Sequence, residues 1–289
     1  MYPLPFRWNL ARQEQLGKLI EPLKDKKLSF PFINDVVQCC AKIVGYSGNS
    51  RLVFVGRSPE YFFDYLSGLL SGTSWEERIS LLHFSMRFQE ESKIRKEYPE
   101  AIPAMREYLT SLNLHPHGIA TGDHPVTFVD AVDTGDTFSR LIHLLHNWCK
   151  EIGYDWLAVN RRIKLVGITE RTHNSPNTWR WQQQVDWIDL LRQNSVKNIS
   201  VDLYFSRILT VWGRKMTKSY HPARWGDEEL AHPDHQEKRI EALCWAYTLF
   251  QQAKTRESRL EFIKQLTELP AIKESWLRKL TQELRFKAS

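Results

Sequence analysis

Short apolar runs alternate along the chain with stretches whose apolar residues recur at helical spacing. The runs are rich in β-branched and aromatic residues, which is typical of strands buried on both faces of a parallel sheet. Strands that alternate with helices predict an α/β fold, with an open, mainly parallel sheet and helices on both faces. The predicted strands are Leu52–Val55, Ile79–Phe84, the run that begins at Val126, Arg162–Ile168 and Ile199–Phe205.

Helical periodicity occupies the remainder of the chain. From Glu228 onward only helical patterns occur. We therefore expect an α/β domain over residues 1–227, with a helical segment in its first 50 residues, and a helical C-terminal region over residues 228–289. That region would pack on the α/β domain or mediate association with a partner. Helices are also predicted for the stretch from Leu16 to near Glu21, where Pro22 should end the helix, and for Ile33–Ile43, the stretch after Pro59, Pro103–Leu112 and the stretch after Phe138.

The most informative stretch runs from Val126 to Phe138, where a strand is followed by a loop of Asp, Thr and Gly and then by a helix. This layout points backbone N–H groups and a helix N-terminus at one place, which favours an anion. Thr hydroxyls add donors, and a carboxylate at the strand end, such as Asp130, can accept hydrogen bonds from ribose hydroxyls. The stretch therefore predicts a site for a phosphorylated sugar.

Residues Val129 to Thr137 resemble the phosphoribosyl-pyrophosphate (PRPP) motif of the type I phosphoribosyltransferases, a strand followed by two acids, two apolar residues, an acid or small residue and Thr-Gly-x-Thr. The resemblance implies that Asp130 holds the ribose hydroxyls and a Mg²⁺ ion that bridges oxygens of PRPP. It also implies that Asp133 assists the incoming nitrogen nucleophile. The phosphate-binding loop would consist of Thr134, Gly135, Asp136 and Thr137.

The stretch departs from the family motif at two positions. Val129 stands where the first of the two acids is expected, so ribose binding loses a carboxylate. Asp136 stands at the variable position of the loop, where it places a like charge beside a phosphate dianion. At about 4 Å this repulsion amounts to roughly 1 kcal/mol in water and more at lower dielectric. The loop would tolerate Asp136 if its side chain turns outward.

A second strand, loop and helix precede the first by about seventy residues. The strand Leu52–Val55 leads into Gly56, Arg57 and Ser58, and Pro59 suits the first turn of the helix. Gly56 permits close approach of a ligand, Ser58 offers a hydroxyl, and Arg57 offers a forked donor for phosphate. The separation is compatible with the pyrophosphate-binding loop of the same family, and a surface ion pair is the alternative role for Arg57.

Other interpretations of the central stretch remain open. Asp-Thr-Gly is also the core of aspartic proteases, although those enzymes need antiparallel strands on both sides. A haloacid-dehalogenase-like nucleophile would need Asp-x-Asp, whereas Asp130 and Asp133 are three positions apart. The plainest alternative is an ordinary loop between a strand and a helix, in which Asp and Thr side chains cap the helix.

Three further segments carry candidate side chains. The charged stretch Arg87–Glu97 lies where related enzymes have a loop that closes over PRPP, and its cations could contact pyrophosphate, although a solvated helix also fits. Glu170 and Arg171 follow a predicted strand, where ligands bind in parallel sheets. The aromatic and cationic stretch Thr178–Trp187 would either stack a base or pack as an amphipathic helix. The cations of the charged stretch are Arg87, Lys93, Arg95 and Lys96.

Charge narrows the choice of partners. The 289 residues carry a formal net charge of +6, and residues 161–218 hold eleven Lys and Arg against four Asp and Glu. This basic segment suits phosphate-rich ligands or nucleic acid, and a solvated basic face fits it equally. The four cysteines lack metal-ligand and disulfide-framework spacing, which favours a reducing compartment. The sequence contains no run of membrane-spanning length and no signal-peptide profile, so we expect a cytoplasmic protein.

Two classes of function are compatible with these features. The first is a transferase that displaces pyrophosphate from PRPP and attaches phosphoribosyl to a nitrogen nucleophile. The second is a non-enzymatic regulator or effector of the same fold, such as those in bacterial defence, that binds a nucleotide or nucleic acid. The absent first acid at Val129, Asp136, the atypical loop at Arg57 and the basic segment favour the second class.

Overall fold

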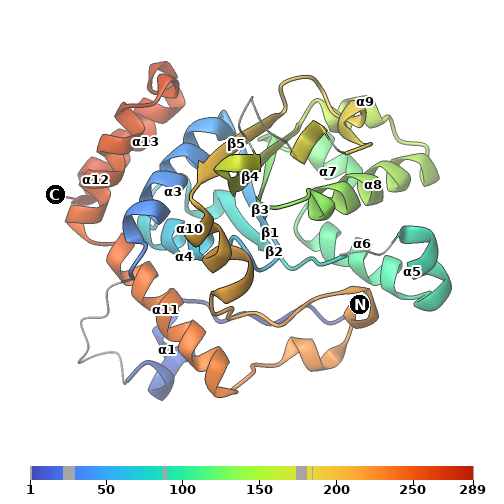
Figure 1. Ribbon diagram of the computed structural model, residues 1–289, viewed down its shortest axis with the longest axis horizontal. Coiled ribbons are helices and arrows are strands. Elements are labelled where there is room, and N and C mark those ends of the chain that lie inside the picture. Colours follow the sequence, from blue (N-terminus) through green and yellow to red (C-terminus); the bar gives the residue numbers. More distant parts are fainter. Residues whose placement is uncertain (1, 22–29, 87–89, 174–180, 184, 289) are drawn as a thin grey trace.

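A computed structural model describes residues 2–21, 30–86, 90–173, 181–183 and 185–288. The five strands form one parallel sheet in the order β2-β1-β3-β4-β5, with helices on both faces (Figure 1). The predicted fold class is therefore confirmed, including the C-terminal helical extension. The strands are β1 (Arg51–Val55), β2 (Ile79–Leu82), β3 (Val126–Val132), β4 (Ile163–Glu170) and β5 (Val196–Val201).

Side chains that alternate along each strand enter two separate cores, one on each face of the sheet. On β1, Leu52 and Phe54 join the first core, while Val53 and Val55 join the second. All four side chains are fully buried, which explains why the strand reads as a continuous apolar run. Helices α3, α4, α12 and α13 contribute to the first core, and α6 and α8 to the second.

Helix boundaries agree with the sequence patterns over most of the chain. The predicted helix after Pro59 begins at Glu60, and the predicted helix from Ile33 extends to Ser47. The helices are α1 (Gln13–Leu16), α3 (Ile33–Ser47), α4 (Glu60–Leu69), α5 (Glu91–Glu97), α6 (Ala101–Ser111), α7 (Pro116–Thr121), α8 (Asp136–Glu151), α9 (Trp156–Asn160), α10 (Leu203–Arg207), α11 (Glu237–Ala253), α12 (Arg256–Thr267) and α13 (Ser275–Ala288).

The C-terminal helices pack directly on the α/β part of the chain. Helix α11 lies along α4, and α12 contacts α3 (Figure 1). Gly68 on α4 permits this approach, because a Cβ atom there would collide with the backbone of Phe250 on α11. Trp276 at the start of α13 stacks on Trp75, with ring centroids 5.4 Å apart. One apolar core thus joins residues on both sides of position 227.

The N-terminal segment also packs against these helices. Leu10, Leu16 and Ile20 form a third apolar cluster with residues of α11. Arg7 forms an ion pair with the buried carboxylate of Asp64 on α4 at 2.5 Å. Burial raises the pKa of Asp64 to about 6 even though Arg7 opposes the rise. These contacts agree with core packing of this segment.

Two predicted strands end elsewhere in the structure. The strand predicted for Ile199–Phe205 is β5 at Val196–Val201, and Leu203–Arg207 is helical. Asp202 explains the change, because its carboxylate accepts the Phe205 N–H at 2.9 Å and caps α10. Strand β2 stops at Leu82, so His83 and Phe84 lie in the loop that follows.

Two other predicted elements fall partly outside the described residues. Within Thr178–Trp187, the described part contains a 3₁₀ turn at Trp181–Gln183. The helix predicted from Leu16 to near Glu21 is present as the short α1 followed by a 3₁₀ turn at Gly17–Ile20, and Leu23, which belongs to the same apolar pattern, lies outside the described residues. In the described parts of the chain, no helix has both the length and the apolar character needed to cross a membrane.

Candidate functional site

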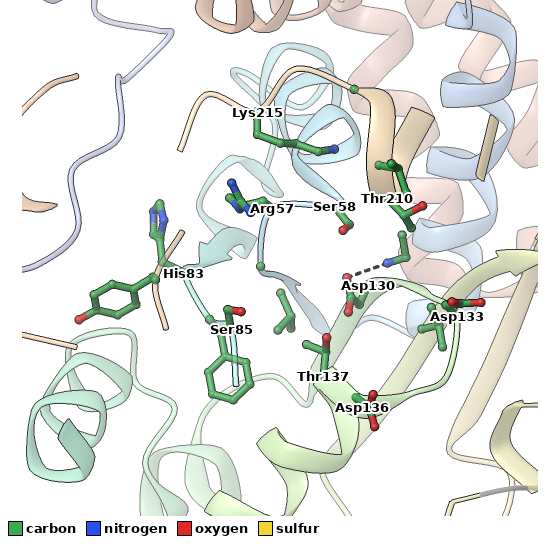
Figure 2. Close-up of a pocket in the computed structure, with 18 of the residues that line it drawn as sticks. Arg57, Ser58, His83, Ser85, Asp130, Asp133, Asp136, Thr137, Thr210 and Lys215 are labelled. Atoms are coloured by element: carbon green, nitrogen blue, oxygen red, sulfur yellow. Dashed lines mark hydrogen bonds between the residues drawn. The ribbon is translucent and has the colours of Figure 1, made fainter. Parts of the chain in front are cut away.

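A cavity of about 680 Å³ opens at the carboxyl ends of β1 and β3 (Figure 2). These strands are neighbours at the point where the strand order reverses, since β2 lies on one side of β1 and β3 to β5 lie on the other. Ligands of open α/β sheets bind at such switch points. All residues predicted for the two loops after β1 and β3, together with Asp130, line this one cavity: Gly56, Arg57, Ser58, Asp130, Asp133, Thr134, Gly135, Asp136 and Thr137.

The loop after β3 turns sharply into the N-terminus of α8. Gly135 precedes the helix with φ of 90°, in the left-handed region that favours glycine. A Cβ atom there would also lie 2.6 Å from the ring of Trp181, which is fully buried. Because α8 runs for sixteen residues, its first N–H groups carry the positive end of a full helix dipole. The turn and the helix together favour an anion in the cavity.

Asp130 is the most deeply buried carboxylate of the cavity, with 4% of its surface exposed. It accepts the N–H of Ala131 at 2.8 Å and a hydrogen bond from the side chain of Thr137. Burial nevertheless raises its pKa to about 8, because these contacts and the charge of Lys215 do not replace the lost hydration. At neutral pH the group is mainly a neutral carboxyl, which can both donate and accept hydrogen bonds.

Val129 faces away from the cavity. Alternation along β3 directs its side chain into the core on the opposite face of the sheet, where it is fully buried. The absence of an acid at this position therefore leaves Asp130 as the carboxylate at the end of the strand. A carboxylate at Val129 would be placed among apolar side chains at a large energetic cost.

The other two acids of the loop are more accessible. The Asp133 side chain is 65% exposed, and its carboxylate lies 3.3 Å from Nδ1 of His173. The Asp136 carboxylate accepts the hydroxyl of Thr134 at 2.9 Å. Figure 2 shows Asp136 on the far side of the loop from Arg57 and Lys215. Asp136 nevertheless lines the cavity, so its charge lies near any anion bound there.

The loop after β1 supplies the opposite wall. Gly56 has φ of 75° and donates its N–H to Leu82 at 2.8 Å, which joins this loop to the end of β2. Burial lowers the pKa of Arg57, with a smaller contribution from the positive charge of Arg239. Among the described residues no carboxylate lies within 4.0 Å of Arg57 to form an ion pair. The surface ion pair considered for this residue is therefore absent from the described part of the chain.

A third wall, which the sequence patterns did not assign to the site, comes from the segment after α10. Lys215 donates from Nζ to the carbonyl of Leu209 at 2.7 Å and lies 4.8 Å from the centre of the Tyr61 ring. Burial lowers the pKa of Lys215 to about 8 despite the nearby charge of Glu60. Figure 2 shows Lys215, Arg57 and Ser58 on one side of the cavity and Thr137 on the other.

Hydrogen bonds from two helices hold this wall in place. The buried carboxylate of Glu60 on α4 accepts the N–H of Met216 at 3.0 Å and the hydroxyl of Thr217. Arg239 on α11 donates to the carbonyls of Lys215 and Thr217 at 2.6 and 2.9 Å. Each helix thus contributes two bonds to three consecutive residues, which orients Lys215 from both sides.

The cavity is strongly cationic, with seven Lys and Arg side chains against three Asp. Four of the cations come from the predicted basic segment 161–218, but that segment does not form one surface. Arg162 and Lys164, for example, donate to Gly122 and Ser47 and do not line the cavity. The seven cations are Arg57, Arg207, Arg214, Lys215, Lys218, Lys238 and Arg239.

Other candidates from the sequence lie outside the cavity. Arg95 pairs with Glu91 at 2.5 Å and with Glu151 at 2.6 Å, which leaves its charge satisfied on α5. Neither Glu170 nor Arg171 lines the cavity. Arg87 lies outside the described residues. His83 and Ser85, which the sequence analysis did not assign to the site, do line the cavity. Their position directly after the apolar run of β2 is the sequence feature that could have indicated this.

Searches of protein-family models, curated proteins and solved structures found no significant match to this chain.

Proposed function

We propose that this cavity binds a phosphoribosyl ligand that carries a second phosphate-rich group, of which PRPP is the model. The observation that supports this most strongly is the placement of two loops. The loop after β1 and the loop after β3, about seventy residues apart in sequence, line opposite sides of one cationic cavity at the switch point of the sheet. A ligand with phosphates at both ends matches two separate anion-binding walls.

Each wall has a distinct role in this proposal. The backbone amides of residues 134–137 would bind the 5′-phosphate at the N-terminus of α8, because the hydroxyls of Thr134 and Thr137 already donate to Asp136 and Asp130. Asp130, between the walls, binds the ribose hydroxyls. Arg57 and Lys215 bind the diphosphate, for which Arg57 offers a forked donor and Lys215 a point charge.

Transfer of the phosphoribosyl group to a nitrogen nucleophile follows as the proposed reaction. Displacement of pyrophosphate passes through an oxocarbenium-like state, so the protein mainly positions the reactants and stabilises charge. Asp133 would accept the proton of the nucleophile, since it is exposed at the mouth of the cavity. Arg57 and Lys215 would stabilise the negative charge that develops on the leaving pyrophosphate.

Mg²⁺ is part of the proposal because the resemblance implies it. Mg²⁺ at phosphate sites is commonly held by one or two carboxylates together with ligand oxygens and water. Asp130 is buried at the strand end and, because its pKa is raised to about 8, would have to release its proton when it binds the ion. When bound, the ion would neutralise part of the ligand's charge. The described residues contain no cluster of three or more ligating side chains, so the ligand itself would have to supply most of the oxygens.

A non-catalytic sensor is the second candidate. It is favoured by the position of Val129, whose burial on the opposite face leaves ribose binding with one carboxylate where the family motif has two. Such a protein would bind the phosphosugar or a nucleotide and report its presence without releasing pyrophosphate. Binding and turnover therefore have to be measured separately.

The binding test uses isothermal titration with PRPP, ribose 5-phosphate and pyrophosphate, each with and without Mg²⁺. We expect Arg57→Gln to weaken pyrophosphate roughly tenfold, the size of a lost charge-assisted hydrogen bond, and to leave ribose 5-phosphate largely unchanged. Thr137→Val should show the opposite preference. Absence of PRPP binding to the wild-type protein in either condition would rule out the proposal.

The turnover test follows pyrophosphate release from PRPP in the presence of nucleobases and other nitrogen nucleophiles. Asp133→Asn should abolish release while PRPP still binds. If the wild-type protein binds PRPP and releases no pyrophosphate with any acceptor, the sensor is favoured. If Asp133→Asn retains full turnover, Asp133 is not the proton acceptor.

A further inference from the structure

Two neighbouring aromatic side chains, of which Trp212 lines the cavity, are more than half exposed. Tyr204 is 58% exposed and Trp212 is 57% exposed, and their ring centroids lie 5.5 Å apart at an angle of 57°. Leu203 and Val211 beside them are also more than half exposed. We call Leu203, Tyr204, Val211 and Trp212 the aromatic rim. Grouped exposed apolar side chains of this kind mark interaction sites more often than single ones do.

The backbone presents this rim through an unusual turn. Helix α10 continues into a π-helix at Ile208–Trp212, which closes with the N–H of Gly213 on the carbonyl of Ile208 at 2.9 Å. Phe205 and Leu209 point into the core and are fully buried, so they carry the packing of this segment. A side chain at Gly213 would collide with Ile208, so glycine is required. π-Helical turns are frequent at functional sites.

The rim is continuous with the cationic cavity. Val211 and Trp212 line it together with Arg207 and Lys238, which are exposed and form no ion pair with any described residue. These cations are additional to Arg57 and Lys215 on the inner wall. A phosphosugar with two phosphate-bearing ends is accounted for by the inner wall and the N-terminus of α8. Arg207 and Lys238, which we call the outer cations, and the aromatic rim are therefore available to bind a longer anion.

We propose that the aromatic rim stacks the bases of a single-stranded polynucleotide whose phosphates lie along the outer cations, with one end directed into the cavity. Single-strand binding sites combine a positively charged groove with aromatic side chains, because every base has a face on which an aromatic ring can stack. The cations select this occupant over an apolar protein surface, which would leave Arg207 and Lys238 buried without partners. The inference goes beyond the phosphosugar site and does not require it to be correct.

The test measures the affinity of fluorescein-labelled oligonucleotides of about fifteen residues, oligo(dT) and oligo(U), by fluorescence anisotropy. We expect Trp212→Ala and Tyr204→Ala each to weaken binding by roughly tenfold, as for loss of one base stack. Trp212→Phe should keep most of the affinity, because it retains a ring. Phe286→Ala is the matched control, since Phe286 is 78% exposed on the distant helix α13 and should have no effect.

Salt dependence and competition provide independent outcomes. Arg207→Gln should reduce the slope of log affinity against log salt by about 0.7, the value for one phosphate contact on a single strand. An excess of unlabelled duplex of equal length should compete poorly. No oligonucleotide binding, unchanged affinity in Trp212→Ala, or equal competition by duplex would each overturn the inference. Rim-dependent formation of a protein dimer without oligonucleotide binding would overturn it as well.

A parallel titration with PRPP separates the two proposals. Binding of oligonucleotide through Trp212 without any binding of PRPP would support this inference and overturn the phosphosugar site. Binding of PRPP without binding of oligonucleotide would overturn this inference alone.

Discussion

At the scale of single residues, Asp130 illustrates how position changes the chemistry of a side chain. Its carboxyl group is enclosed at the end of β3, and burial raises its pKa from 3.8 to about 8. Asp133, three residues later, is largely exposed. Two carboxyl groups three residues apart, one at the end of β3 and one in the loop after it, therefore differ in their solvation.

The raised pKa predicts a pH dependence of stability in the protein without ligand or divalent cations. The folded protein keeps the Asp130 proton at pH values where the unfolded chain has lost it. Stability from this group is thus complete below pH about 4 and is lost as the pH rises through about 8. Asn has no proton to lose in this pH range, so Asp130→Asn does not lose stability as the pH rises. Each unit of pKa shift corresponds to about 1.4 kcal/mol, so the difference can reach a few kcal/mol.

We expect Asp130→Asn to melt several degrees above the wild type at about pH 8.5 and to approach it near pH 4, measured by differential scanning fluorimetry. Asp133→Asn is the control and should follow the wild type throughout. A melting temperature of Asp130→Asn below that of the wild type across the whole range would contradict the assigned environment.

At the scale of elements, the wall formed by residues 214–217 depends on the helices behind it. Tyr61 donates to the carbonyl of Arg214 at 2.9 Å, and Glu60 accepts from Met216 and Thr217. These bonds tie an irregular segment to the first turn of α4, which itself begins after the loop at Arg57. Helix α4 therefore links the wall that contains Arg57 to the wall formed by residues 214–217.

Glu60→Gln should loosen this wall. The neutral amide of Gln removes the negative charge that strengthens the hydrogen bonds from the Met216 N–H and the Thr217 hydroxyl, at a cost of about 1–2 kcal/mol. Hydrogen exchange of the Met216 amide should accelerate by roughly tenfold or more, and pyrophosphate should bind more weakly. Glu241→Gln is the control, because its pair with Arg214 is exposed and contributes about 0–1 kcal/mol. Equal exchange rates in the two variants would count against the anchoring role.

At the scale of the whole molecule, the C-terminal helices and the sheet share one core. Helix α11 lies on α4 at Gly68 and also supplies Lys238 and Arg239 to the cavity. The site thus depends on a helix that begins more than a hundred residues after the loop at Gly135. Because the same helix stabilises the fold and completes the cavity, we expect sheet and C-terminal helices to unfold together.

Gly68→Ala tests this coupling. The added methyl group would collide with the backbone of Phe250 and push α11 from α4, which costs about 1–3 kcal/mol for overpacking. We expect a melting temperature several degrees lower in a single transition, with coincident circular dichroism and tryptophan fluorescence. Ser67→Ala, at the half-buried residue before Gly68, should change the melting temperature by less. Two separate transitions, or an unchanged melting temperature in Gly68→Ala, would argue against a shared core.

Hydrophobic periodicity predicted most helices and strands because each element has to bury its own apolar side chains, and these recur at the spacing of that element. The apolar run at Leu52–Val55 favoured a strand with both faces covered, and the structure places it second in the sheet order, between β2 and β3. Prediction was wrong where one side chain redirected the backbone. The apolar residues Leu203 and Phe205 matched a strand pattern, but capping by Asp202 begins a helix there.

For the candidate site, the residues that were predictable are those whose conformation is determined by near neighbours in sequence. The turn at Thr134–Thr137 and the loop at Gly56–Ser58 were visible because strand, glycine and helix follow one another directly. Lys215 and Arg239 were not predictable. Lys215 is oriented by its hydrogen bond to the carbonyl of Leu209, and Arg239 by its hydrogen bonds to the carbonyls of Lys215 and Thr217. No sequence pattern in these segments indicates that the two side chains reach the cavity.

The sequence by itself therefore determined the parallel α/β architecture, the C-terminal helices and the two glycine-containing loops that follow β1 and β3. The tertiary structure alone decided that these loops share one cavity, that Asp130 is enclosed while Asp133 is exposed, and that seven cations converge there. The physical reason is the distance along the sequence over which each effect acts. Periodicity and turn chemistry act over a few residues, whereas desolvation and charge depend on every segment that packs nearby, however distant in sequence.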